Sequence, residues 1–180
     1  HKMFNVGLKD HSRITDVGIF DNHCRAAVLK KRYVDFPDRF KFCFVRNPWE
    51  RCLSWYNYHK KFPKLQEYKV TFETWVLSGC PHHWGPQNGT RYKAEKRSPL
   101  QQYQFIYDDN GNCLVDFIGR METFEHDLEY VCDKIGVQFN HVEHKNKTNT
   151  ENWKSQYTPA MIQKIHQLFI KDIQLFNYSY

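Results

Sequence analysis

The sequence has no long apolar run. No stretch approaches the ~18 consecutive apolar residues that a membrane-spanning helix needs, and no apolar core of a signal peptide is present. Internal repeats and low-complexity tracts are also missing, so a solenoid or a fibrous protein is excluded. We therefore expect a single folded domain over residues 1–180, with no membrane segment in it.

The cysteines do not form paired motifs. The six cysteines include no Cys-x-x-Cys pair. Cys43, Cys52 and Cys132 fall on apolar patterns that are typical of a core, so we expect reduced, buried thiols rather than a disulfide framework. Three Asn-x-Ser/Thr tripeptides, at Asn88, Asn146 and Asn177, favour a secreted chain, but such tripeptides also arise by chance.

Aromatic and basic residues are abundant. The 14 Phe, 11 Tyr and 5 Trp residues are enough to fill a packed core. The formal net charge of +6 favours an anionic partner, such as a nucleotide, a phosphorylated or sulfated molecule, or a nucleic acid. An ordinary basic surface has the same composition, so the charge does not decide between them.

The apolar pattern alternates between short strands and helices. Residues 40–45 form an apolar run that is typical of a central parallel strand. Helices are predicted over residues 24–34, 48–61, 70–77, 124–135 and from Pro159 to the end. Residues 104–107 and 113–118 flank Asp108-Asp-Asn-Gly111, which predicts a hairpin. The fold class is therefore α/β, a three-layer sandwich around a mainly parallel sheet.

An arginine ends the predicted strand at residues 40–45. Ligands of open parallel sheets bind beyond the carboxyl ends of the strands, where Arg46 lies. Arg51 and Ser54 are three residues apart on the next helix and share a face. Guanidinium and hydroxyl groups near a helix N-terminus bind phosphate well. We infer a phosphate site at Arg46 and Ser54, with Arg51 behind it. The alternative is that Arg46 pairs with a carboxylate, Arg51 is solvated and Ser54 bonds its own helix.

The stretch from Phe44 to Tyr58, FVRNPWERCLSWYNY, resembles the 3′-phosphate-binding motif of sulfotransferases that use PAPS (3′-phosphoadenosine 5′-phosphosulfate). The closest likeness is to carbohydrate sulfotransferases of the heparan sulfate 2-O and chondroitin 4-O kind and their bacterial relatives. Residues 115–127, 144–150 and 171–178 are similar to further segments of that family, in the same order. The resemblance covers roughly residues 20–178 and implies a P-loop-like sulfotransferase fold.

The resemblance implies PAPS as sulfuryl donor and no metal. It implies that Arg46 and Ser54 bind the 3′-phosphate and that Lys147 and Thr148 contact the nucleotide. Arg120 is predicted to face the cofactor, with an ion pair to Glu122 or to a neighbouring helix as the alternative. The family's first strand and phosphosulfate loop have no counterpart in these residues. We expect them to precede His1, with a natural fragment that lacks them as the alternative.

Sulfuryl transfer also needs a base for the acceptor hydroxyl, and histidine suits that role. We predict His23 as this base, with His11 as the competing candidate. Residues 78–99 combine turn signals, aromatic and basic residues, and are predicted to recognise the acceptor. Cys80-Pro-His-His83 and His141-Val-Glu-His144 contain metal-ligand types, but their spacing matches no zinc pattern, so no metal is predicted.

The predicted function is thus transfer of a sulfuryl group from PAPS to a hydroxyl, with a carbohydrate as the expected acceptor and no nucleic acid partner. One alternative is a nucleotide-binding, kinase-like protein, although no Walker-type loop is present. Another is a non-catalytic module that binds an anionic ligand. We expect a cytoplasmic protein, with the lumenal catalytic domain of a Golgi enzyme as the alternative.

Overall fold

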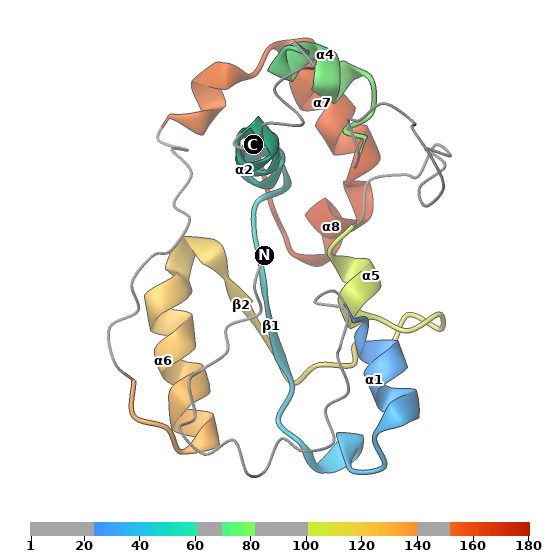
Figure 1. The fold of residues 1–180 in the computed structure, drawn as a ribbon, viewed down its shortest axis with the longest axis vertical. Coiled ribbons are helices and arrows are strands. Elements are labelled where there is room, and N and C mark those ends of the chain that lie inside the picture. The colour runs from blue at the N-terminus through green and yellow to red at the C-terminus, as the bar shows by residue number, and fades with distance from the viewer. Residues whose placement is uncertain (1–23, 61–69, 82–100, 140–151) are drawn as a thin grey trace.

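A computed structural model describes residues 24–60, 70–81, 101–139 and 152–180 (Figure 1). The first half of this part holds α1 (Ala26–Arg32), a 3-10 turn η2 (Phe36–Asp38), β1 (Phe42–Val45), α2 (Pro48–Lys60) and α4 (Phe72–Leu77). The second half holds α5 (Tyr103–Ile106), β2 (Phe117–Arg120), η3 (Met121–Thr123), α6 (Phe124–Ile135), η4 (Trp153–Gln156), α7 (Pro159–Leu168) and α8 (Ile170–Leu175).

The two strands form a parallel pair. β1 and β2 align from Phe42 with Phe117 to Val45 with Arg120. Parallel strands require a crossover, and here β2 follows α2, α4 and α5 in the chain. The predicted mixture of helices with a parallel sheet is confirmed for the described residues, whereas the three-layer sandwich stays a prediction.

Side chains on both faces of this sheet are covered. On one face α6 packs Phe124, Leu128 and Val131 against Phe44 and Phe117. The other face joins a cluster built on Val45, Ile106 and Phe176, from β1, α5 and the turn after α8. Figure 1 accordingly shows α6 on one side of the strands and α5 on the other. Phe42, by contrast, is 38% exposed, so the outer end of β1 is less buried than its sequence predicts.

Glycine at position 119 is what lets α6 and β1 approach β2 this closely. A Cβ atom at Gly119 would lie 2.6 Å from the ring of Phe44 and 3.2 Å from Cβ of Asp127. The first of these distances is shorter than any normal carbon contact. The close packing of Phe44 therefore explains the glycine at position 119 of β2.

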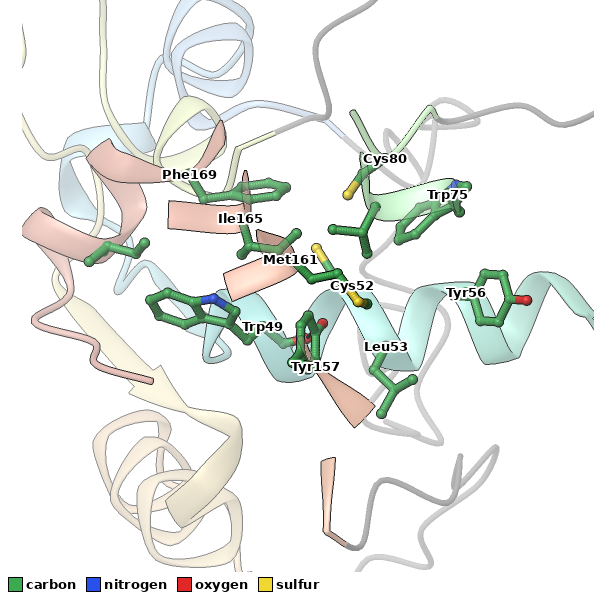
Figure 2. Packing of buried hydrophobic residues seen from close by; sticks show 12 residues of the cluster. Trp49, Cys52, Leu53, Tyr56, Trp75, Cys80, Tyr157, Met161, Ile165 and Phe169 are labelled. Carbon is green, nitrogen blue, oxygen red and sulfur yellow. Dashed lines mark hydrogen bonds between the residues drawn. The ribbon is translucent and has the colours of Figure 1, made fainter. Parts of the chain in front are cut away.

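The largest cluster of buried side chains lies among α2, α4, α7 and α8 (Figure 2). Its twelve buried members are Trp49, Cys52, Leu53, Tyr56, Trp75, Val76, Cys80, Tyr157, Met161, Ile165, Phe169 and Ile173. Aromatic rings meet here edge to face, an arrangement that their quadrupoles favour. Because α2 leads directly out of β1, this cluster fixes the direction in which the chain leaves the sheet.

The predicted helix boundaries rest on local signals, and the structure confirms where α2 and α7 begin and where α6 ends. The single last helix predicted from Pro159 is wrong, because the non-helical backbone of Phe169, with φ of −119° and ψ of 25°, divides it into α7 and α8. The side chain of Asn47 accepts a hydrogen bond from the Trp49 N–H at 3.0 Å, and Pro48 opens α2. Thr158 caps α7 in the same way. Gly136 ends α6 in the left-handed conformation, with φ of 70°.

The predicted hairpin around Asp108-Asp-Asn-Gly111 is only partly correct. The turn exists, since the Asp108 carboxylate accepts backbone N–H groups from Asn110 and Asn112, and Tyr107 pairs antiparallel with Cys113. The strand predicted over residues 104–107 is wrong, because this segment forms α5. A carboxylate from α8 that caps this segment, described below, explains why a helix forms. The strand predicted over 113–118 begins later, at Phe117.

The expectation of reduced cysteines is confirmed, since all six are free in the structure. Cys52 and Cys132 are buried as predicted, whereas Cys43 is only partly buried. Its surroundings still desolvate the thiol and raise the pKa of Cys43 to about 12. Within the described ranges, every helix is too short or too polar to span a lipid bilayer.

Candidate functional site

Arg46 and Arg120 lie at the same edge of the sheet. The register pairs Val45 of β1 with Arg120 of β2, so Arg46 directly follows its strand beside Arg120. This edge is the carboxyl end of both parallel strands, where open α/β sheets bind their ligands. The structure thus brings together two of the predicted site residues from segments far apart in the sequence.

The guanidinium of Arg46 forms an ion pair with Glu50. Nη2 of Arg46 lies 2.6 Å from Oε1 of Glu50, one helical turn further on. The two side chains are 18% and 17% exposed, so the pair is partly shielded but still reaches the surface. The alternative geometry considered for Arg46, a carboxylate partner, is therefore present, and phosphate binding stays a prediction.

Arg120 is held by the segment that follows α8. Its Nη2 atom donates to the Phe176 carbonyl at 2.6 Å, and its guanidinium lies 4.7 Å from the centre of the Tyr178 ring. The ion pair with Glu122, the alternative predicted for Arg120, is absent from the ion pairs of the described residues.

Glu122 instead joins the start of α2 to the C-terminal segment. Its Oε1 accepts the backbone N–H of Asn47 at 2.6 Å, and its Oε2 accepts the Tyr178 hydroxyl at 3.1 Å. Burial and the neighbouring Glu122 carboxylate raise the pKa of the Tyr178 phenol above its ordinary value. Tyr178 therefore stays a neutral hydrogen-bond donor beside Arg120.

Ser54 and Arg51 lie along α2. Ser54 is half-buried and lies six residues into the helix from Pro48, or about 9 Å of helix rise. The Arg51 guanidinium lies 5.9 Å from the ring centres of both Trp55 and Phe169. Burial lowers the pKa of Arg51, so this side chain belongs to the core between α2 and α8 more than to the open edge of the sheet. Its proposed place behind the phosphate stays a prediction.

The backbone amides where β1 leads into α2 already have acceptors. The Arg46 N–H bonds to Oε1 of Gln102 at 2.9 Å, the Asn47 N–H bonds to Glu122, and the Trp49 N–H bonds to Asn47. Pro48 has no N–H group to offer. An anion at this edge must therefore be recognised mainly by side chains rather than by these helix N-terminal amides.

Two residues that the sequence analysis did not single out complete the site. The side-chain amide of Gln102 bonds to the backbone of Arg46, and the buried carboxylate of Asp172 bonds to the backbone of Gln102. The sequence pattern around Asp172 could have pointed to this residue. It lies in the inward stripe of Phe169, Ile173 and Phe176, where a charged residue needs a structural reason. No such pattern surrounds Gln102.

The remaining predicted residues lie outside the described residues. These are His23 and its competitor His11, Lys147 and Thr148, and most of the predicted acceptor loop. In the part of the chain that the structure describes, no three His, Cys, Asp or Glu side chains are grouped to hold a metal ion. The absence of a metal stays a prediction.

The described residues suit a phosphate group, but the Glu50 carboxylate competes with it. The backbones of Arg46 and Arg120 lie at the same end of the sheet, and their guanidinium groups are planar, charged donors of the kind that phosphate oxygens prefer. The Glu50 carboxylate occupies Nη2 of Arg46, and its negative charge repels a phosphate. A phosphate at Arg46 therefore competes with Glu50 for this guanidinium.

Known proteins place this geometry in context. The model of the sulfotransferase family matches residues 10–179. An uncharacterized protein of Archaeoglobus fulgidus is 35% identical over 96 residues, which covers 53% of this chain and 67% of that protein. Carbohydrate sulfotransferase 10 of Xenopus laevis is 24% identical over 178 residues, which covers 78% of this chain.

The chain spans 47% of the length of the Xenopus protein, or about half. No solved structure gives a significant match. The family match covers nearly the whole chain and confirms the resemblance drawn from the motif at residues 44–58. The chain therefore belongs to the sulfotransferase family.

Proposed function

We propose that the protein transfers a sulfuryl group from PAPS to a hydroxyl group of a carbohydrate. The observation that carries this proposal is the pair Arg46 and Arg120 at the carboxyl edge of the parallel sheet, in a chain of the sulfotransferase family. The likeness to carbohydrate sulfotransferase 10 supports a sugar acceptor. PAPS would supply the activated sulfuryl group.

The protein's side chains would hold and orient the reactants. Arg46 and Ser54 bind the 3′-phosphate once Glu50 has released Arg46, and Arg120 adds a second positive charge at the same edge. Lys147 and Thr148 contact the nucleotide in this proposal. Tyr178 and Glu122 keep the segment after α8 against Arg120 and Asn47.

In the proposed reaction the acceptor hydroxyl oxygen forms a new bond to sulfur. The bond between sulfur and the bridging oxygen of the 5′-phosphate breaks, and 3′-phosphoadenosine 5′-phosphate leaves with that electron pair. The hydroxyl proton passes to a base, for which we propose His23. The six free cysteines support the further proposal that the protein works in the reducing cytoplasm.

Calorimetric titration tests the cofactor site. The ligands are 3′-phosphoadenosine 5′-phosphate and adenosine 5′-monophosphate, which differ only in the 3′-phosphate. The wild type should prefer the first ligand, and Arg46→Ala should lower that preference by about tenfold to a hundredfold, the range for a charge-assisted hydrogen bond.

Arg39→Ala is the matched control for that variant. Arg39 also pairs with a carboxylate four residues away, Asp35, at the same 2.6 Å, but it lies before β1 and is 64% exposed. This control should keep the wild-type preference. A wild type that binds both nucleotides equally contradicts the proposed function.

A further inference from the structure

The backbone of Arg46 is held by the side chain of one residue. Oε1 of Gln102 accepts the Arg46 N–H at 2.9 Å, and Nε2 of Gln102 donates to the Arg46 carbonyl at 2.9 Å. A primary amide offers one acceptor and a donor side by side, as a neighbouring strand does. Gln102 therefore extends the pairing of β1 by one residue, although 56 positions separate the two residues in the sequence.

Gln102 is itself held by a buried carboxylate. Oδ2 of Asp172 accepts the Gln102 N–H at 2.7 Å, and Oδ1 accepts the Tyr103 N–H at 2.8 Å. Asp172 is fully buried in α8, and both of its oxygens point at the first turn of α5. A buried carboxylate is costly unless it is hydrogen-bonded or paired with a charge, and here these two bonds and the nearby Arg51 guanidinium stabilise it.

The two contacts form one chain from α8 to the site. Asp172 fixes where α5 begins, α5 fixes the side chain of Gln102, and Gln102 fixes the peptide group from which the Arg46 side chain departs. Glu122 holds the next peptide, at Asn47. Small displacements of a positioned charged group weaken recognition strongly, so the accuracy of this peptide matters for a ligand of Arg46.

We infer that Gln102 and Asp172 are positioning residues for the phosphate-binding arginine. Neither residue touches the phosphate in this inference; both act through the backbone of Arg46. The inference rests on the proposed function. It predicts that a change in either residue weakens recognition of the 3′-phosphate in particular, rather than binding of the whole nucleotide.

The test uses Gln102→Leu, which keeps the approximate size of the side chain and removes both hydrogen bonds to Arg46. The readout is the ratio of the dissociation constants for adenosine 5′-monophosphate and 3′-phosphoadenosine 5′-phosphate. A purely structural role would weaken both nucleotides and leave this ratio unchanged. We expect the ratio to fall about threefold to tenfold, the scale of one or two net hydrogen bonds.

Two further variants make the result decisive. Gln104→Leu removes an amide from the same helix whose oxygen accepts only the Gln101 N–H among the hydrogen bonds described, and it should keep the ratio. Asp172→Asn keeps the side-chain shape, should lower the ratio in the same direction, and serves if Gln102→Leu does not fold. Thermal unfolding of each variant confirms that the titrations are made on folded protein.

The outcomes separate this inference from the proposed function. A wild type without preference for the 3′-phosphate overturns both. A preference in the wild type that Gln102→Leu and Asp172→Asn both retain overturns the positioning role alone. An equal loss in the Gln104→Leu control also overturns it, because the effect would then come from a general disturbance of α5.

Discussion

At the scale of single residues, other residues hold both the side chain and the backbone of Arg46. Its side chain meets the carboxylate of Glu50, while its backbone is bound by Gln102. The pairing with Glu50 is local, four residues apart on the start of α2. A partly exposed ion pair of this kind contributes at most about 1 kcal/mol, so a phosphate with two or three charged oxygens can displace it.

This competition predicts the effect of Glu50→Gln. The variant removes the negative charge that holds Arg46 and keeps the shape of the side chain. We expect the dissociation constant of 3′-phosphoadenosine 5′-phosphate to fall about threefold to tenfold, since the carboxylate no longer competes or repels. Titration calorimetry at low salt measures this change.

The control for this variant is Glu73→Gln, an exposed glutamate in the first turn of α4, which should leave the affinity as in the wild type. Weaker nucleotide binding by Glu50→Gln would contradict the competition. It would show that Glu50 orients Arg46 for the ligand instead of blocking it.

The sequence reveals local partners more readily than distant ones. Arg46 directly follows an apolar run in the sequence. Both predictions for its side chain, that it binds a phosphate or that it pairs with a carboxylate, rest on that position. Gln102 and Asp172 lie 56 and 126 residues further along the chain. Only the folded arrangement of β1, α5 and α8 brings them to Arg46, so no spacing pattern in one sequence points to this contact.

At the scale of elements, the junction between β2 and α6 depends on Asp127. Its Oδ2 accepts the Arg120 N–H at 2.7 Å and the Thr123 hydroxyl at 2.8 Å, which ties the end of the strand to the first turn of the helix. Burial alone would raise the pKa of Asp127. The hydrogen bonds from Arg120, His126 and Thr123 together lower it by more than burial raises it, so the pKa is below its ordinary value.

Asp127→Asn should therefore destabilise the protein at neutral pH by about 1–2 kcal/mol, the scale of hydrogen bonds to a charged group. Because the folded-state pKa is lowered, this contribution is present above the unfolded value near 3.8 and is lost as the pH falls through the folded value. The difference between wild type and variant should shrink on acidification. Urea unfolding at several pH values measures it.

Asp133→Asn is the matched control on the same helix. Asp133 is exposed near the end of α6, and its replacement should change the free energy of unfolding by less than about 0.5 kcal/mol. A loss for Asp127→Asn that stays constant from neutral pH to below pH 3 would show that packing, not the carboxylate charge, explains the effect.

Elements whose signals are local were predicted well. Asn47 and Thr158, each followed by a proline, mark the starts of α2 and α7, and Gly136 marks the end of α6, as the structure confirms. The break between α7 and α8 at Phe169 has no such signal and was not predicted. α5 was predicted as a strand because its aromatic and amide residues favour either structure, and the carboxylate of Asp172 that caps it comes from α8. A distant cap overrides weak local preference.

At the scale of the whole molecule, the candidate site lies where several parts of the chain meet. β1 and β2 end there, α2 begins there, and the segment after α8 returns to it (Figure 1). The Asn47 side chain donates to the Ser179 carbonyl at 2.9 Å, which joins the start of α2 to this last segment. A ligand bound at this edge therefore contacts elements that belong to separate hydrophobic clusters.

Nucleotide binding should accordingly stabilise the fold as one unit. A ligand at a hundred times its dissociation constant stabilises the native state by about 2.7 kcal/mol, which for a chain of this size raises the unfolding midpoint by about 5–10 °C. Thermal unfolding with 3′-phosphoadenosine 5′-phosphate should show this rise in a single transition, and adenosine 5′-monophosphate at equal concentration should give a smaller one.

Arg46→Ala should reduce the rise, whereas Arg39→Ala should preserve it. Equal shifts for both nucleotides would mean that the 3′-phosphate is not recognised at this sheet edge, and a second transition would mean that the clusters unfold separately despite the shared site.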